Sequence, residues 1–208
     1  MNQMPPKRRG DAREKILELA ESAVLAKGFT ATSIDELVVG AGITKSGFFY
    51  HFKDKNALAK AMILRYLDRD KELLDDLFRR AAELNEDPLH GFLVGLKMFA
   101  ELMADLPDNY PGCLAASFCY QDQLFDAEIR DLNAQGMLEW RQRFRARFDA
   151  IAGRYPPREP VDMEALADMT TVLVEGGLIL GRALQDSSIL PRQILMFRDY
   201  VRLVFAPA

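Results

Sequence analysis

Residues 33–55 read SIDELVVGAGITKSGFFYHFKDK, and they constrain the fold more than any other part of the chain. Ser33 and Glu36 have the spacing of a capping box, in which each side chain satisfies a free backbone N–H at the start of a helix. The Gly40-Ala41-Gly42 triplet ends that helix, because glycine adopts positive φ at little cost. Thr44 is then placed to cap a second short helix. Two short helices joined by a glycine turn predict a helix-turn-helix motif.

The second helix of the motif is expected over residues 45–52, and it begins with small or cationic residues suited to the base edges of a major groove. Lys45 is the best candidate to contact a guanine, because lysine pairs with the O6 and N7 acceptors of that base. The candidate base contacts are Thr44, Lys45, Ser46 and Gly47, and the candidate phosphate contacts are Ser33, Tyr50, His51 and Lys55. For His51, packing within the motif is the alternative to a phosphate contact.

Charge is unevenly distributed along the chain. The net charge of −4 by itself argues against a nucleic-acid partner, but residues 1–60 carry +3 and the remainder carries −7. A basic end on an acidic body is typical of a protein with one DNA-facing pole. Because so small an asymmetry also arises by chance, charge supports the motif without deciding the function.

The motif resembles the DNA-binding region of the tetracycline-repressor (TetR) family. The matching residues are Gly28-Phe29, Thr32-Ser33, Ala41-Gly42-Ile43, Lys45-Ser46-Gly47, His51-Phe52, Lys55 and Leu58. One position departs from the family pattern: Phe49 stands where the family usually has a tyrosine whose hydroxyl touches a phosphate. The resemblance implies a homodimer that binds a palindromic operator in double-stranded DNA and carries an effector pocket among its middle helices.

Helical periodicity extends over the rest of the chain, and no alternating strand pattern occurs. Beyond the motif, helices are expected at about 11–27, 55–83, 88–106, 113–123, 126–154, 162–185 and 191–205. The expected fold class is all-α with about nine helices. An N-terminal three-helix DNA-binding domain would occupy residues 1–54, and a helical domain for effector binding and dimerisation would occupy residues 55–208.

The last two expected helices carry little polar surface, so each has to bury more than one side. They either form the core of one subunit or pair with the same helices of a second subunit in a two-fold four-helix bundle. We prefer the pairing, because C2 dimers dominate soluble oligomers, and the resemblance points the same way. The candidate dimerisation residues are Val172, Gly176, Leu180, Leu184, Phe197, Val201 and Val204.

The middle helices are rich in methionine and aromatic residues, which typically line small-molecule sites between bundle helices. The candidate ligand-binding residues are Met98, Phe99, Met103, Cys113, Phe118, Tyr120, Trp140 and Phe144. For any one of them, ordinary core packing is the stronger expectation. As a set they indicate an effector cavity, which the resemblance also implies. No cofactor is expected.

Cys113 begins an expected helix, where the helix dipole lowers the pKa of a thiol. The resemblance adds that a subset of the family senses electrophiles through cysteine. The opposing interpretation, that Cys113 is a small buried apolar residue, is the stronger one.

Other classes of function fit the sequence poorly. Cys113 with His90 is the only candidate nucleophile and base, and neither a phosphate-binding glycine loop nor a metal signature is present in the sequence. The sequence has no membrane-length apolar run and no secretory signal, so we expect a cytoplasmic protein. We expect a dimeric, sequence-specific transcriptional repressor that a small-molecule effector releases from its operator. The alternative is a DNA-binding regulator whose C-terminal domain binds a protein partner instead.

Overall fold

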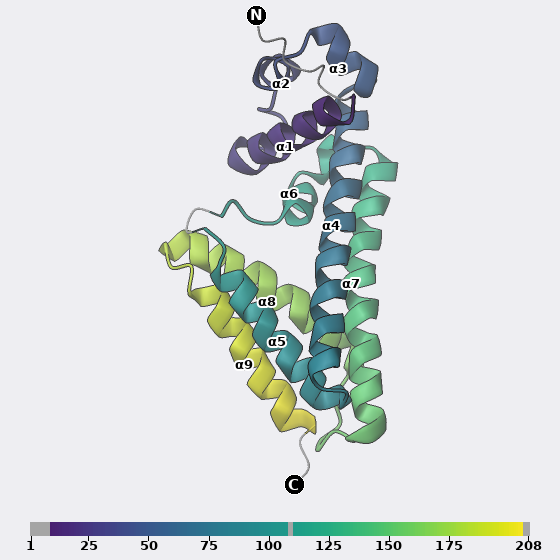
Figure 1. Cartoon of the computed structure of the whole chain (residues 1–208), viewed down its shortest axis with the longest axis vertical. Coiled ribbons are helices and arrows are strands. Elements are labelled where there is room, and N and C mark those ends of the chain that lie inside the picture. The colour runs from purple at the N-terminus through teal and green to yellow at the C-terminus, as the bar shows by residue number, and fades with distance from the viewer. Residues whose placement is uncertain (1–8, 108–109, 206–208) are drawn as a thin grey trace, which may run out of the picture. The chain divides into compact units, whose positions relative to one another are not determined.

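The computed structural model describes residues 9–107 and 110–205, with side chains from residue 12 onward. Within these ranges the chain forms helices and no strand, which confirms the all-α prediction (Figure 1). The helices are α1 (Arg9–Lys27), α2 (Ile34–Ala41), α3 (Lys45–His51), α4 (Lys55–Leu84), α5 (Pro88–Ala104), α6 (Leu114–Tyr120), the 3-10 helix η1 (Asp122–Leu124), α7 (Ala127–Arg154), α8 (Met163–Leu184) and α9 (Ile189–Phe205).

The helix starts of the motif follow the predicted capping residues. The Ser33 hydroxyl accepts a hydrogen bond from the Glu36 backbone N–H at 3.2 Å, and the Thr44 hydroxyl accepts one from the Gly47 N–H at 3.1 Å. The end of α2 differs in detail from the expectation, because α2 continues through Gly40 and stops at Gly42. The φ of Gly42 is +66°, so this glycine supplies the left-handed turn between the two helices.

The start of α9 also differs from the prediction. This helix begins at Ile189, so Pro191 lies inside the first turn rather than at its first position. Proline is tolerated there, because the first four N–H groups of a helix have no partner within the helix.

The chain divides into two compact units. The first consists of the chain up to Leu67 together with Cys113–Asn133, and the second consists of Asp68–Gly112 and the chain from Ala134 onward. The predicted boundary at residue 54, between a DNA-binding domain and an effector-binding domain, stays a prediction. The two compact units are defined by packing and not by function. The unexpected feature is that α6, η1 and the start of α7 pack with the N-terminal helices.

Two sets of contacts bind the first unit together. The Arg65 guanidinium of α4 is only 13% exposed, and it pairs with Glu14 at 2.6 Å and Glu21 at 2.7 Å, both on α1. At the other end of α1, Phe29 lies 4.9 Å from Phe125, measured between ring centroids. Phe125 in turn stacks on Phe118 of α6 at 4.3 Å. These rings connect the segment after α1 to residues far downstream in the sequence.

A side-chain to backbone hydrogen bond reinforces this connection. The Gln121 side-chain oxygen accepts from the Phe29 backbone N–H at 3.0 Å, while the Gln121 amide nitrogen donates to the Ser117 hydroxyl at 3.2 Å. Because Phe29 follows the end of α1, its N–H would otherwise lack a helical partner. Gln121 therefore satisfies the backbone where the chain turns towards α2.

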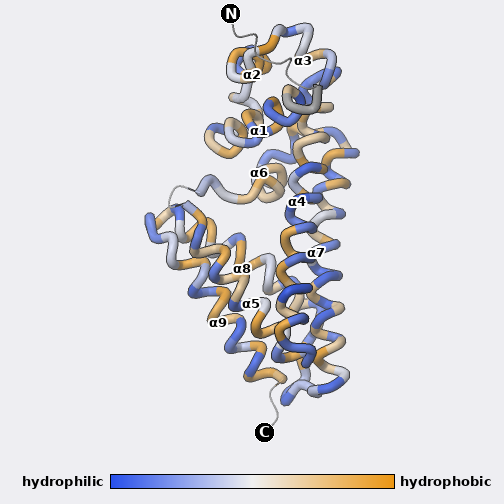
Figure 2. The backbone as a smooth tube through the Cα atoms, in the orientation of Figure 1, coloured by the Kyte–Doolittle hydropathy of each residue, from blue (hydrophilic) through white to orange (hydrophobic). Residues whose placement is uncertain are grey.

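In the second unit, α9 packs against both α5 and α8. Figure 2 shows apolar residues recurring between polar ones along these three helices, which is the pattern of helices that bury one face. The core is rich in aromatic rings: Phe92 stacks on Phe78 at 5.6 Å and meets Phe148 edge to face at 5.1 Å.

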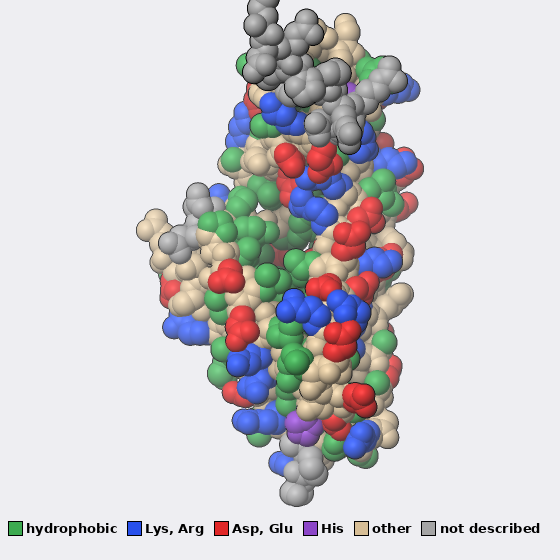
Figure 3. All heavy atoms as spheres, viewed as in Figure 1, with side chains coloured by type: hydrophobic (Ala, Val, Ile, Leu, Met, Phe, Trp, Pro, Cys, Tyr) green, Lys and Arg blue, Asp and Glu red, His purple; other side chains and the backbone are tan. Residues whose placement is uncertain are grey.

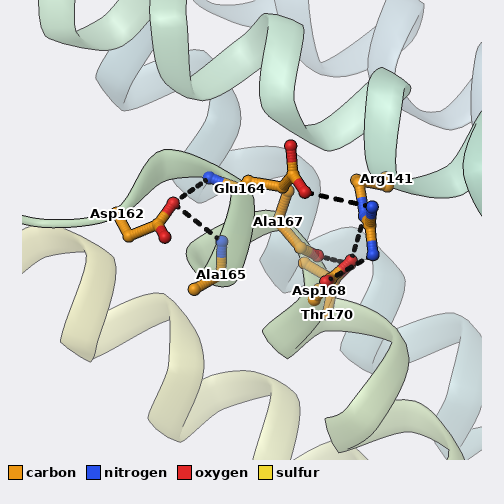
Figure 4. Close-up of polar contacts among 7 residues, drawn as sticks. All are labelled: Arg141, Asp162, Glu164, Ala165, Ala167, Asp168 and Thr170. Atoms are coloured by element: carbon orange, nitrogen blue, oxygen red, sulfur yellow. Dashed lines mark hydrogen bonds and ion pairs between the residues drawn. The ribbon is translucent and has the colours of Figure 1, made fainter.

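Polar contacts join α7 to α8 at the edge of this core (Figure 4). The Arg141 guanidinium donates to both carboxylate oxygens of Asp168, at 2.7 and 2.8 Å, and to Glu164 at 3.1 Å. Asp162 caps the start of α8 by accepting from the backbone N–H groups of Glu164 and Ala165. The bidentate geometry specifies how the two helices align.

Candidate nucleic-acid interface

The helix α3 is anchored on one side and exposed on the other. Phe48 is completely buried and Phe52, its C-cap residue, is 3% exposed, so these two rings attach α3 to the first unit. Thr44, Lys45 and Ser46, at the start of the helix, are exposed. Of the predicted base contacts, only Gly47 is half-buried. The turn at Gly42 therefore presents the start of α3 to the outside, as the sequence predicts.

Lys45 has a partner that the sequence analysis missed. Its ammonium nitrogen lies 2.9 Å from a carboxylate oxygen of Asp35 on α2, and the two side chains are 58% and 75% exposed. Asp35 stands in the first turn of α2, where an acidic residue is expected for capping reasons alone. No spacing rule for helices α2 and α3 would have revealed the pair, because it forms across the turn.

The hydroxyls of the motif are already used in capping. The Ser33 hydroxyl accepts from the Glu36 backbone N–H and donates to the Glu36 carboxylate at 3.5 Å. The Thr44 hydroxyl accepts from the Gly47 N–H, which leaves its proton for a hydrogen bond to DNA. Among the predicted phosphate contacts, Tyr50 is 68% exposed and its ring meets the half-buried His51 ring at 5.1 Å.

Lys55 has partners within the first unit. Its ammonium group donates to the backbone carbonyl of Phe29 at 2.5 Å and lies 4.4 Å from the centre of the Phe29 ring. Burial lowers the pKa of this lysine, and the charge of Glu36 opposes that effect. Lys55 therefore holds the segment after α1 in place, and its contact with a phosphate stays a prediction.

The predicted ligand-binding residues do not form a single lining. Phe99 and Phe144 are buried in the second unit and border a small cavity of about 10 Å³, together with Leu96, Thr170, Leu173, Val174, Ile194 and Phe197. Met98, Met103 and Trp140 are half-buried against the same core. A cavity of this size has room for about one water molecule, so an effector could enter only if side chains moved.

Trp140 makes a specific polar contact. Its indole N–H donates to the carboxylate of Asp70 on α4, and its ring lies 5.5 Å from that of Phe144. Burial raises the pKa of the Asp70 carboxyl, while the Trp140 hydrogen bond and the charge of Arg143 lower it, and the net shift is upward. Asp70 is a partly buried acid that the sequence analysis did not single out.

The other three predicted ligand residues belong to the first unit. Phe118 is 2% exposed and packs on Phe125, so it is a core residue of that unit, whereas Tyr120 is 72% exposed. Cys113 caps α6, with its sulfur accepting from the Ala116 N–H at 3.4 Å, and the Tyr66 hydroxyl lies 3.1 Å from the same sulfur. The predicted helix start at Cys113 is confirmed, and its role as a sensor stays a prediction.

The predicted dimerisation residues of α8 lie on its outer surface. Val172, Leu180 and Leu184 are 67%, 49% and 66% exposed, and a side chain added at Gly176 would meet no atom within 4 Å. Gly177 behaves differently, because it is buried where Leu190 of α9 passes close to it. Gly176 therefore lies on the outer surface of α8, whereas Gly177 lies on the side that packs against α9.

Two of the predicted dimerisation residues of α9, Phe197 and Val201, require a correction. Phe197 and Val201 are 4% and 0% exposed in the core of their own subunit, and Val204 is half-buried against that core. Phe197 and Val201 therefore offer no open surface to a partner. The exposed apolar side chains of α9 are instead Leu195, Met196, Tyr200 and Leu203, of which the last three recur at helical spacing on the other side of the helix.

Positively and negatively charged side chains are mixed on the surface. Lysine, arginine, aspartate and glutamate side chains lie interspersed on the face in view in Figure 3. No helix within residues 9–107 and 110–205 is long and apolar enough to span a membrane. Nor does this part of the chain bring three His, Cys, Asp or Glu side chains together as a metal site.

Comparisons with known proteins agree with the motif. The family model for bacterial regulatory proteins of the tetR family matches residues 16–62. The HTH-type transcriptional repressor NemR of Escherichia coli (strain K12) is 32% identical over 69 residues, covering 33% of this chain and 35% of NemR. The HTH-type transcriptional regulator LmrA of Bacillus subtilis (strain 168) is 23% identical over 183 residues, covering 86% of this chain and 90% of LmrA. The more similar match thus spans about a third of the relative's length.

Solved structures extend the likeness to the whole fold. A TetR transcriptional regulator from Chloroflexus aurantiacus has a TM-score of 0.79 at 21% identity, covering 96% of this chain and 98% of that chain. The reduced form of E. coli NemR has a TM-score of 0.75 at 17% identity, covering 95% and 100%. Residues 16–62 therefore match the DNA-binding region of the bacterial regulatory proteins of the tetR family, and the chain as a whole has the fold of the solved TetR regulators.

Proposed function

We propose that the chain is a homodimeric, sequence-specific DNA-binding regulator that represses transcription in the cytoplasm. The observation that carries the proposal is the geometry of α3, which Phe48 anchors from behind while Thr44, Lys45 and Ser46 are exposed at its start. Helix-turn-helix proteins contact base edges with the first residues of this second helix. The relative NemR is named a repressor, which supports repression rather than activation.

The proposed dimer forms through α8 and α9. Val172 and Leu184 on α8, with Met196 and Leu203 on α9, are each more than 60% exposed. Apolar patches of this kind mark interaction surfaces in soluble proteins. A two-fold dimer would bind a palindromic operator if its two α3 helices matched successive major grooves, about 34–36 Å apart.

We propose that a small-molecule effector binds in the second unit near Phe99 and Phe144 and lowers the affinity for DNA. The apolar cavity wall and the half-buried Met98, Met103 and Trp140 supply adaptable surface for such a ligand. By linkage, the effector has to bind the DNA-free form more tightly, and the coupling is typically about 1–3 kcal/mol.

The small cavity also favours a second candidate, in which the second unit binds a protein partner and no small molecule. The two candidates differ in a thermal-shift screen of apolar and aromatic compounds. A ligand that raises the melting temperature and also releases DNA supports the effector. The partner is favoured if no compound shifts the melting temperature while a purified protein partner alters DNA binding.

The test of DNA binding uses the full chain and a library of random duplexes. The recovered duplexes should share a palindromic sequence. Lys45→Ala should change which bases are recovered, because we propose that Lys45 reads a base edge. Lys53→Ala, at the exposed residue after α3, should weaken all sequences alike and reduce the salt slope by about one. Recovery of no shared sequence would reject the DNA-binding proposal.

A further inference from the structure

The helix α3 carries Phe49, a large side chain with no polar group, in an exposed position. Phe49 is 46% exposed, and its ring meets the edge of Phe48 at 5.5 Å with the ring planes at 90°. Because Phe48 is completely buried, this contact restrains one side of the Phe49 ring. The rest of the ring remains uncovered. Phe48 and Phe52 already attach the helix to its unit, so Phe49 is not needed for that purpose.

Phe49 shares a face of α3 with the residues proposed to read bases. It follows Lys45 by four positions and Ser46 by three, and residues at these spacings are neighbours on a helix surface. Lys45 itself reaches an exposed carboxylate, that of Asp35 on α2. The uncovered ring therefore lies beside the cation that we propose contacts a guanine.

The chemistry of the major groove limits what this ring can contact. A phenyl ring has no hydrogen-bond donor or acceptor, so it cannot bond to a phosphate or to the polar edge of a base. The apolar group that a base pair presents in the major groove is the C5-methyl of thymine, and phenylalanine is among the side chains that pack on it. We propose that Phe49 recognises a thymine methyl group in each half-site and is a specificity-determining residue.

This assignment rests on the proposed DNA-binding function. It can be tested by removing a single methyl group from the DNA. In duplexes recovered with the full chain, each thymine is replaced in turn by deoxyuridine, which removes the methyl group and nothing else. At one position in each half-site we expect the affinity to fall about fourfold, the effect of one buried methyl group, and about sixteenfold when both half-sites are changed.

Variants then test whether Phe49 is the partner of that methyl group. Phe49→Ala should bind the thymine and deoxyuridine duplexes equally, whereas Phe49→Tyr, which keeps the ring, should still discriminate. Leu64→Ala is the matched control, because Leu64 is an exposed apolar residue of α4, 39% exposed, and this variant should discriminate like the wild type. If Phe49→Ala lost its cooperative melting transition, Phe49→Gln would replace it.

Two results would overturn the assignment. One is a wild-type protein that binds every deoxyuridine duplex as tightly as the parent duplex. The other is a Phe49→Ala protein that keeps the full discrimination. Recovery of no shared sequence from the random library is a different failure, because it would reject the DNA-binding function itself and this assignment with it.

Discussion

The ammonium nitrogen of Lys45 lies 2.9 Å from a carboxylate oxygen of Asp35, so an acidic residue of α2 holds the cation that we propose reads a base. Both side chains are more than half exposed, and exposed pairs add little to stability. The pair matters for recognition, because Lys45 has to share or leave this carboxylate on reaching DNA. The carboxylate also repels nearby phosphates.

We expect Asp35→Asn to tighten binding to every duplex by about 0.5–1 kcal/mol at low salt, because it removes the competing carboxylate. It should also reduce the preference for the selected sequence, since Lys45 would no longer be oriented. Fluorescence anisotropy with the selected and a scrambled duplex measures both effects. Asp149→Asn, the same charge change in the second unit, should do neither. Equal effects of the two variants would contradict the role of Asp35.

Gln121→Ala should lower the free energy of unfolding by about 1–3 kcal/mol. The change leaves the backbone N–H of Phe29 without its 3.0 Å acceptor, and an unpaired buried donor has a cost of this size. Gln123→Ala is the control, because Gln123 is exposed in the neighbouring η1. Urea denaturation followed by circular dichroism measures both. A Gln121→Ala variant as stable as Gln123→Ala would show that water replaces the contact at no cost.

Gly95→Ala should destabilise the second unit by about 1–3 kcal/mol, because an added Cβ would lie 2.6 Å from two ring carbons of Phe78. Gly153→Ala is the paired experiment, since a Cβ at Gly153 in α7 would meet nothing within 4 Å. That substitution should stabilise the protein by up to about 1 kcal/mol, the usual gain from replacing a helical glycine. The opposite ranking in thermal melting would show that the Phe78 ring moves aside freely.

Stability should depend on pH through Asp87, the N-cap of α5. Burial raises the pKa of this carboxyl. Hydrogen bonds from the His90 backbone, the Tyr155 hydroxyl and the His90 ring, together with the charge of Arg154, lower the pKa by more than burial raises it. The net pKa is therefore well below its usual value. A lowered folded-state pKa gives stability that is present above the unfolded-state pKa, near 3.8, and is lost as the pH falls below it.

The matching variant is Asp87→Asn, which keeps the cap but removes the charge. We expect it to be less stable than the wild type by about 1–3 kcal/mol at pH 7, the value of hydrogen bonds to a charged group, and by progressively less below pH 4. Urea titrations of both proteins at several pH values give this difference. A constant difference across the acid range would mean that the charge contributes nothing.

Replacing Val172 and Leu184 with lysine should convert the proposed dimer to a folded monomer and abolish tight operator binding. Both side chains are about two-thirds exposed, so the substitution should leave the core of the subunit intact. Sedimentation or light scattering gives the mass, and circular dichroism reports the fold. Leu64→Lys, on an exposed site of α4, should remain dimeric. A wild-type protein that is monomeric at micromolar concentration would rule out the proposed interface.

The parts of the fold that depend on local chemistry followed from the sequence. Capping by Ser33 and by Thr44 is encoded within a few residues, and both caps are confirmed. The sequence left open which glycine of the Gly40-Ala41-Gly42 triplet turns the chain, because either can adopt positive φ, and in the structure it is Gly42.

The parts that depend on distant contacts did not follow. The apolar residues of α9 form two stripes, and the sequence alone does not show that the stripe with Phe197 and Val201 is covered from within the subunit. Likewise, Lys55 looks like a free cation until Phe29 is brought next to it. The pairing of Lys45 with Asp35 and the hydrogen bond of Gln121 are also products of folding, with no periodic signal to reveal them.

The packing of Phe118 and Phe125 on Phe29 limits how this protein can be divided. A polypeptide that stopped after residue 67 would contain the whole helix-turn-helix yet leave Phe29 without its aromatic neighbours and its backbone N–H without Gln121. The N-terminal part is therefore not a transplantable module by itself. A chimaera that borrows its DNA specificity would have to supply the stretch from Cys113 to Asn133 as a second piece.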